Sequence, residues 1–406
     1  MNTGRSTLAA QALLVATALV AGPTSAQDPE LRRIPNSEFY GEPTTCRVTE
    51  RFEIYDPHSL EELQKVKQMG FDQVILDRAP LHTLATQIGL DVVIANWWTP
   101  ETEESVIQDS IALSKKVAPG RLRGISLMDE PERNTPDTPF EFYIDLYKRI
   151  KSETKSLQNT RLEISYWGPL SRWDDRYYRE FAKLYQAADV MRLMPYPDLN
   201  EGPLREVYLM MRRSDRAMAM ASVDIPKIVI LQTWVLEPKN KLPTIDELRV
   251  MAYQAMLGGA ETLSFFEYKP EVWDQTPGFE AKFEELMQEL VGLRARLRGA
   301  SITSTLHKSG ILVSQLTWSN GQMATVRVNT NRISTEDLAR LAVEDGSLEV
   351  DLPLPNEPAY GQQLANQTAN AYPSCIRRIP SCCEVRGKGT RPNLLDRCNL
   401  RLFRRR

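Results

Sequence analysis

Eight short runs rich in Val, Ile, Leu and Phe recur along the chain, and their spacing constrains the fold more than any other feature. Longer, charged stretches with helical spacing lie between them. Unbroken apolar runs, unlike alternating ones, are typical of parallel strands whose outer face is covered by helices. The runs are residues 52–56, 73–77, 92–98, 124–130, 162–167, 190–196, 228–234 and 262–268.

Eight strands alternating with helices is the number that closes a (β/α)8, or TIM, barrel, and residues 51–298 nearly match the roughly 250 residues typical of one. Ser59 and Thr244 suit helix N-caps, and Glu247 three residues after Thr244 suggests a capping box. An open doubly wound sheet is the alternative, but it needs a Gly-rich turn after the first strand, where residues 56–58 read Asp-Pro-His. We therefore predict a barrel.

After residue 298 the pattern changes to that of a small all-β domain over 299–358, the start of a β-sandwich. Residues 309–313, 316–318 and 323–329 are predicted as antiparallel strands joined by a hairpin with a turn at 319–321, and 348–352 as a further strand. From 359 to 406 no periodicity remains, and from Cys375 onward nine Arg and one Lys face two acidic residues. We expect this Cys- and Arg-rich tail to lack regular structure, as either a basic patch for an anionic polymer or non-native coding sequence.

The N-terminus has the form of a secretory signal peptide over residues 1–26, followed by an extension over 27–50. Arg5 precedes an apolar run, and Thr24-Ser25-Ala26 fits cleavage after Ala26. The run is too short to span about 30 Å of hydrocarbon. We expect a secreted or periplasmic protein without stable membrane insertion.

Composition gives few signs of cofactors or of other partners. A net charge of −3 gives no indication of nucleic acid binding, and three scattered His with no pair of Cys-x-x-Cys motifs argue against a zinc site. Five cysteines in an exported chain leave at least one thiol unpaired or bonded between chains. We predict no metal and no cofactor.

In barrels of this kind the functional residues lie at the C-terminal ends of the strands. Here these ends carry carboxylates, amides and aromatic rings, side chains that can bind sugar hydroxyls and stack on sugar rings. We therefore predict a carbohydrate substrate or ligand. The predicted substrate-binding residues are Asp77, Asn96, Trp97, Trp98, Asp129, Tyr166, Trp167, Tyr196, Gln232 and Trp234.

The motif Asp129-Glu130-Pro131 at the end of the fourth run resembles the Asn-Glu-Pro or Asp-Glu-Pro signature of the large clan A-like group of (β/α)8 glycoside hydrolases. Residues 227–268 are similar to the last two units of such barrels, and the likeness covers roughly residues 50–350. The resemblance implies a glycoside hydrolase with Glu130 as general acid/base.

One position departs from the clan. Its nucleophile is a Glu at the end of the seventh strand, where this chain has Gln232, and an amide cannot form the glycosyl ester. Glu267, one strand on, is our choice for the second catalytic carboxylate, with Asp77 next and Glu237 weaker. Because the position for direct attack carries an amide, an inverting mechanism, with roughly 6.5–9.5 Å between the carboxyl groups, is favoured over a retaining one.

Two other functions compete with hydrolysis. A catalytically inactive barrel that binds glycan is suggested by Gln232. A metal-dependent lyase or an aldolase is a further alternative, against which the scarcity of His and of strand-end Lys argues.

Overall fold

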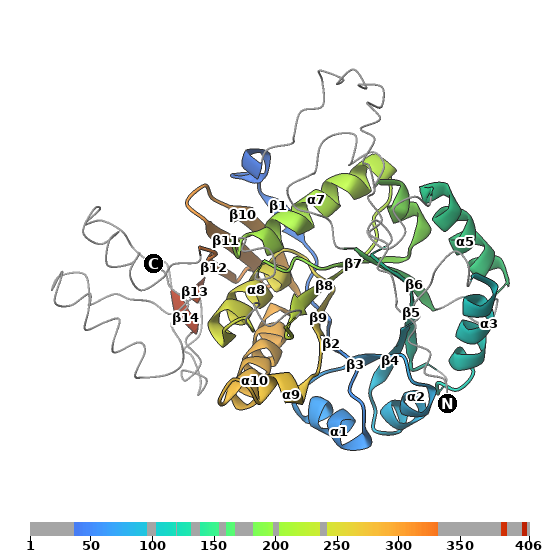
Figure 1. Ribbon diagram of the computed structural model, residues 1–406. Helices are drawn as coiled ribbons and strands as arrows, with labels where there is room; N and C mark the ends of the chain where they lie inside the picture. Colours follow the sequence, from blue (N-terminus) through green and yellow to red (C-terminus); the bar gives the residue numbers. More distant parts are fainter. Residues whose placement is uncertain are drawn as a thin grey trace, which may run out of the picture.

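The computed structural model describes residues 36–95, 103–118, 120–130, 139–153, 160–166, 182–197, 203–235, 242–331, 383–387 and 400–403. Eight parallel strands close a barrel, as predicted, and β9 pairs with β2 to complete the ring (Figure 1). The strands are β2 (Arg51–Tyr55), β3 (Gln73–Leu76), β4 (Asp91–Ala95), β5 (Leu122–Asp129), β6 (Arg161–Tyr166), β7 (Val190–Leu193), β8 (Lys227–Gln232) and β9 (Thr262–Phe266).

Helices surround the ring of strands and cover its outer face (Figure 1). Both predicted N-caps are confirmed. The Ser59 side chain accepts the Glu62 backbone N–H at 3.1 Å, and Thr244 and Glu247 form a capping box. The helices are α1 (Leu60–Gln68), α2 (Ala79–Gln87), α3 (Glu103–Ser114), α5 (Phe140–Glu153), α7 (Glu206–Ala221), α8 (Ile245–Leu257), α9 (Pro270–Trp273) and α10 (Phe279–Leu297), with 3-10 turns η1 (Asn36–Phe39) and η4 (Tyr185–Ala187).

Side chains along each strand point alternately toward the surrounding helices and into the barrel. In β2, Phe52 and Ile54 belong to the apolar core that includes the helices, whereas Glu53 bonds to residues of other strands inside the barrel. The strand ends therefore sit on a rigid, closed scaffold. None of the described helices is both long and apolar enough to cross a membrane.

A six-stranded sheet lies outside the barrel, next to α7 and α8 (Figure 1). Its first strand, β1 (Thr44–Cys46), comes from the segment before the barrel and pairs with β10 (Ala300–Leu306). The predicted turn joins β11 (Ile311–Trp318) to β12 (Met323–Asn329), and β10, unpredicted from the sequence, pairs with β11. The fold is therefore a TIM barrel followed by a small β domain.

Buried polar contacts attach this sheet to the barrel. The Tyr208 hydroxyl on α7 donates to the Ser304 carbonyl at 3.2 Å, and the Ser304 hydroxyl donates to the Leu257 carbonyl at 2.6 Å. Because such groups are costly to leave unpaired in a buried interface, they fix how the sheet sits on α7 and α8.

The tail departs from its prediction at two places. β13 (Cys383–Gly387) pairs with β12, and β14 (Leu400–Phe403) pairs with β13, although no strand was predicted over 359–406. Without β13, the outer edge of β12 would be left with unpaired backbone groups, and pairing with such an edge does not need a strong sequence pattern. The strand predicted over 348–352 lies outside the described residues.

Candidate active site

Glu130 directly follows β5 and has a left-handed backbone, with φ of 46°. Its backbone N–H donates to the Ser165 carbonyl on β6 at 3.0 Å, and the residue is half-buried. This conformation is uncommon for a residue other than Gly, Asn or Asp and costs roughly 1–2 kcal/mol. Residues held in this way cluster at active sites, so the backbone singles out the acid that the sequence motif predicts.

Glu267 directly follows β9 and forms an ion pair with Lys269, whose Nζ lies 2.5 Å from Glu267 Oε1. Its carbonyl accepts the Thr233 hydroxyl at 3.1 Å, which ties the end of β9 to the end of β8. The hydrogen bond to Glu267 raises the pKa of the Lys269 ammonium, so this cation stays charged beside the carboxylate. Glu267 is thus held by a charged partner at the end of β9.

Gln232 ends β8 and is buried, at 1% exposure. Its Nε2 donates to the Trp234 carbonyl at 2.8 Å. Its Oε1 is buried, and no donor among the described residues lies within hydrogen-bond distance. The structure thus places an amide at the end of the seventh barrel strand, as the sequence implied.

Aromatic rings meet near these strand ends. The rings of Tyr55 and Phe266 lie 4.9 Å apart edge to face, and those of Phe266 and Trp234 lie 5.4 Å apart in the same arrangement. Tyr196, predicted to bind substrate, is only 3% exposed and belongs to a cluster with Met194 inside the barrel. Phe266 was not among the predicted site residues, because a lone Phe at a strand end carries no polar signal.

Asp77 and Asp56, the acids that follow β3 and β2, are held differently. Asp77 is exposed and lies 3.5 Å from Nε of the adjacent Arg78. Asp56 is half-buried, has a left-handed φ of 56°, and accepts a hydrogen bond from His58 Nε2 at 2.9 Å. Asp56 was not chosen from the sequence, and the structure shows it as the half-buried acid that follows β2.

Several predicted site residues cannot be placed. Asn96, Trp97, Trp98 and Trp167 lie outside the described residues, as does Glu237. Asp129 and Tyr166 end β5 and β6, so their backbones lie at the predicted edge. Their side chains are outside the described part of the chain.

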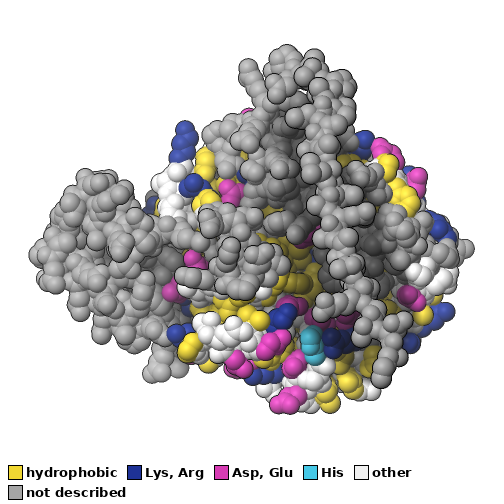
Figure 2. All heavy atoms as spheres, viewed as in Figure 1, with side chains coloured by type: hydrophobic (Ala, Val, Ile, Leu, Met, Phe, Trp, Pro, Cys, Tyr) yellow, Lys and Arg dark blue, Asp and Glu magenta, His cyan; other side chains and the backbone are white. Residues whose placement is uncertain are grey.

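The surface over the barrel is hollowed. Figure 2, drawn from the same side as Figure 1, shows hydrophobic side chains in the hollow and acidic, basic and histidine side chains along its lower rim, over the ends of β2 and β3. Such an arrangement can hold a ligand that has both apolar faces and hydroxyl groups.

A charged layer fills the barrel below this rim. The Arg192 guanidinium on β7 binds both Glu53 and Glu163, with 2.5 Å to Glu163 Oε2, and its Nε donates to the Tyr55 hydroxyl at 3.1 Å. The Ser264 hydroxyl donates to Glu53 at 2.7 Å. Burial, and secondarily Glu53, raises the pKa of Glu163 against the opposing attraction of Arg192. Sequence analysis missed this layer, because barrel interiors usually contain Val, Ile and Leu.

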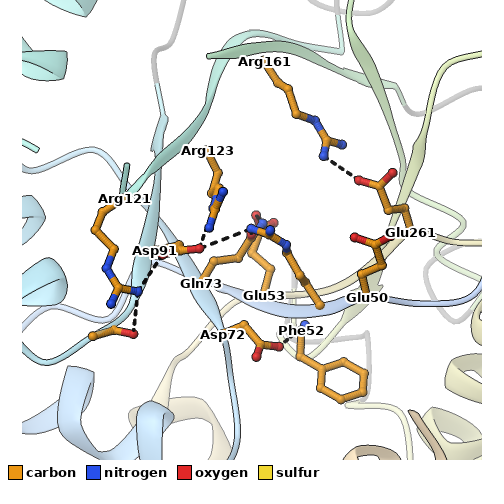
Figure 3. Close-up of polar contacts among 12 residues, drawn as sticks. Glu50, Phe52, Glu53, Asp72, Gln73, Asp91, Arg121, Arg123, Arg161 and Glu261 are labelled. Carbon is orange, nitrogen blue, oxygen red and sulfur yellow. Dashed lines mark hydrogen bonds and ion pairs between the residues drawn. The ribbon is translucent and has the colours of Figure 1, made fainter. Parts of the chain in front are cut away.

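Ion pairs also occupy the opposite, N-terminal end of the barrel. Asp91 Oδ2 accepts from Arg123 Nε at 2.5 Å and from Arg51 at 3.2 Å, and Asp91 Oδ1 accepts from Arg121 at 2.9 Å. Figure 3 shows Arg121 and Arg123 pointing toward Asp91, and Arg161 pointing toward Glu261. These acids are surrounded by cations, which indicates a stabilising role at this end.

Comparison with known proteins supports the fold. Neither a family model nor a curated protein matches the sequence. A 4-O-α-L-rhamnosyl-β-D-glucuronidase from Fusarium oxysporum is 11% identical with a TM-score of 0.50, over 75% of this chain and 81% of that one. An endo-β-1,6-glucanase (11%, 0.47, 71% and 85%) and a glucosidase from Croceicoccus marinus (12%, 0.46, 71% and 75%) are also similar. At these identities the likeness extends to the fold alone.

Proposed function

We propose that this protein is an exported glycoside hydrolase that acts on an oligo- or polysaccharide, with Glu130 as the general acid. The observation that carries the proposal is Glu130 itself. The middle residue of an Asp-Glu-Pro motif directly follows the fourth barrel strand, with a half-buried, left-handed backbone at the end of the barrel where such enzymes act.

The reaction needs a proton donor and a second carboxylate. Glu130 would protonate the oxygen of the leaving sugar. The second carboxylate would come from the neighbouring ends of β9 and β2, where Glu267, our choice from the sequence, and Asp56 lie. The aromatic rings of Tyr55, Phe266 and Trp234 give apolar faces on which a sugar ring can stack.

A screen of the purified protein tests this function. The panel contains laminarin, xylan, arabinan and 4-nitrophenyl glycosides, and the measurement is release of reducing ends or of nitrophenol. We expect turnover of at least one substrate by the wild-type protein and a loss of about 100- to 10,000-fold in Glu130→Gln. Equal activity of the two proteins would remove Glu130 from the mechanism.

A barrel that binds glycan without cleaving it is the second candidate, favoured by the amide of Gln232 in place of the nucleophile. It predicts saturable binding of one polysaccharide of the panel in a gel-retardation assay, with no product even after long incubation. Release of product that depends on Glu130 would rule it out.

Export is proposed from the N-terminal sequence. Mass spectrometry of the protein from the culture medium or periplasm should give a mature chain beginning at Gln27. Recovery of the chain only inside the cell, with its first 26 residues attached, would contradict export.

A further inference from the structure

The order of strands around the barrel bears on which carboxylate works with Glu130. The order is β2-β3-β4-β5-β6-β7-β8-β9, closed on itself, and Glu130 follows β5. Counting one way from β5, the third strand is β8, which carries Gln232. Counting the other way, the third strand is β2, which Asp56 follows. Asp56 therefore stands as far around the ring from Glu130 as Gln232 does, on the other side.

Glu267 has a different position in the ring. It follows β9, which is the fourth strand from β5 in either direction and thus lies directly across the barrel. In a ring of eight evenly spaced strands the opposite position is the most distant one. Its carboxylate is also occupied by Lys269 at 2.5 Å.

We propose that Asp56 is the second catalytic carboxylate, the base that activates water for attack on the sugar bound beside Glu130. This inference rests on the proposed function and names a residue for it. Glu267 then acts as a positioning residue, which holds Lys269 at the neighbouring strand end.

The contacts of Asp56 suit a base. A carboxylate only accepts hydrogen bonds, so His58 Nε2 carries the proton in the 2.9 Å bond to Asp56 Oδ2 and fixes the carboxylate. Asp56 Oδ1 is buried, and no donor among the described residues binds it. The Asp56 side chain is 25% exposed, so with Oδ1 buried the water reaches it at Oδ2, the oxygen that His58 holds in place and that keeps a lone pair for the proton. A base oriented by another group is the usual catalytic arrangement.

A purely structural role does not account for Asp56. The following helix, α1, is capped by Ser59, which accepts the Glu62 N–H at 3.1 Å, and Glu62 in turn accepts the His58 N–H at 2.5 Å. The helix therefore does not need Asp56. Three non-glycine residues in the described part of the chain have positive φ: Ser222, which ends α7, and the two strand-end acids, Asp56 and Glu130.

The step balances as a single displacement. The water oxygen bonds to the anomeric carbon while its proton passes to Asp56. The bond from that carbon to the bridging oxygen breaks, and Glu130 gives its proton to the leaving sugar. The products are a hemiacetal of inverted configuration and an alcohol, and exchange of protons with solvent restores both carboxyl groups.

The test uses the full chain and the panel substrate that the wild-type protein turns over. We compare Asp56→Asn, Asp56→Ala and Glu267→Gln with Asp224→Asn. Asp224 is a matched control because it is exposed and paired with Arg47 at 2.7 Å, and both residues precede the strands β8 and β2, at the opposite end of the barrel from Glu130. We expect kcat to fall about 100- to 10,000-fold in both Asp56 variants, less than tenfold in Glu267→Gln and not at all in the control. Thermal unfolding of each variant shows whether it is folded.

Chemical rescue separates a catalytic role from a structural one. Azide should restore part of the activity of Asp56→Ala and yield a glycosyl azide of inverted configuration, because an anion attacks without a base. Proton NMR of the first product of the wild-type protein should show inversion.

Four outcomes would overturn the inference. Near wild-type activity of Asp56→Asn alongside an inactive Glu130→Gln would overturn it and leave the proposed function intact. Azide rescue of Glu267→Ala instead of Asp56→Ala would also overturn the inference and leave the proposed function intact. A product of retained configuration would have the same two consequences. If the wild-type protein cleaves no member of the panel, the proposed hydrolase and this inference both fall.

Discussion

The two ends of the barrel both carry acidic residues, but these residues are held in different ways. At the N-terminal end Asp91 is shared by three arginines and Glu261 pairs with Arg161 (Figure 3). Neither of these two acids has a positive φ. At the C-terminal end Glu130 and Asp56 have left-handed backbones. Charge alone therefore does not locate a site. Acids surrounded by arginines stabilise the chain, whereas a Glu held in a left-handed backbone at a conformational cost is a candidate for chemistry.

Exchanging an acid for its amide at each end gives the largest expected contrast. Glu130→Gln should lower turnover about 100- to 10,000-fold with little change in stability. Asp91→Asn should keep turnover within about twofold and lose roughly 1–3 kcal/mol, because three arginines lose the carboxylate they share. Kinetics and urea unfolding of both variants measure this. A turnover defect in Asp91→Asn as large as that in Glu130→Gln would break the distinction between the ends.

The charged layer inside the barrel should tolerate the loss of its arginine less well than an ion pair on the surface does. Arg192→Met leaves Glu53 and Glu163 buried without their shared cation, and we expect a loss of about 3–5 kcal/mol in the free energy of unfolding. Arg216→Met, at an exposed pair with Glu38, should cost less than about 1 kcal/mol. Equal losses in urea unfolding would mean that the layer does not depend on the guanidinium.

His82 on α2, whose ring bonds to the Leu76 carbonyl at the end of β3, should make the fold sensitive to mild acid. It is fully buried, and burial lowers its pKa. The unfolded chain then takes up the proton more readily, so the stability present above the ordinary His pKa of about 6.5 is lost as the pH falls below it. Between pH 8 and pH 5.5 the wild-type protein should lose more unfolding free energy than His82→Gln, whereas His307→Gln, at an exposed site, should follow the wild type. Identical losses in wild type and His82→Gln would contradict this.

Glu163 should give a smaller effect of opposite sign. Because its pKa is raised, the folded protein holds this proton more firmly than the unfolded chain, and the stability gained below the ordinary Glu pKa of about 4.3 is lost as the pH rises. Glu163→Gln does not titrate. Its unfolding free energy relative to wild type should therefore increase from pH 4 to pH 7, and a constant difference would show that Glu163 is ionised in both states.

The sequence predicted the barrel well, because eight apolar runs and two capped helices are local signals. It also predicted that Glu130, Gln232 and Glu267 end strands. The strand order around the ring follows from the predicted barrel, but left-handed backbones arise only in the folded chain, so Asp56 was passed over. Glu53 and Arg192 appear in the sequence as ordinary charged residues, and only the tertiary structure buries them together. The strands in the tail have no pattern of their own.

Glycan is expected to bind and react at the C-terminal end of the barrel. The most direct test is a crystal structure of Glu130→Gln with the uncleaved oligosaccharide form of the panel substrate that the wild-type protein turns over. We expect a sugar ring over the ends of β2, β5 and β9, with its glycosidic oxygen within hydrogen-bond distance of Gln at position 130 and its anomeric carbon facing Asp56. A sugar bound at the N-terminal end, or on the outer sheet, would contradict it.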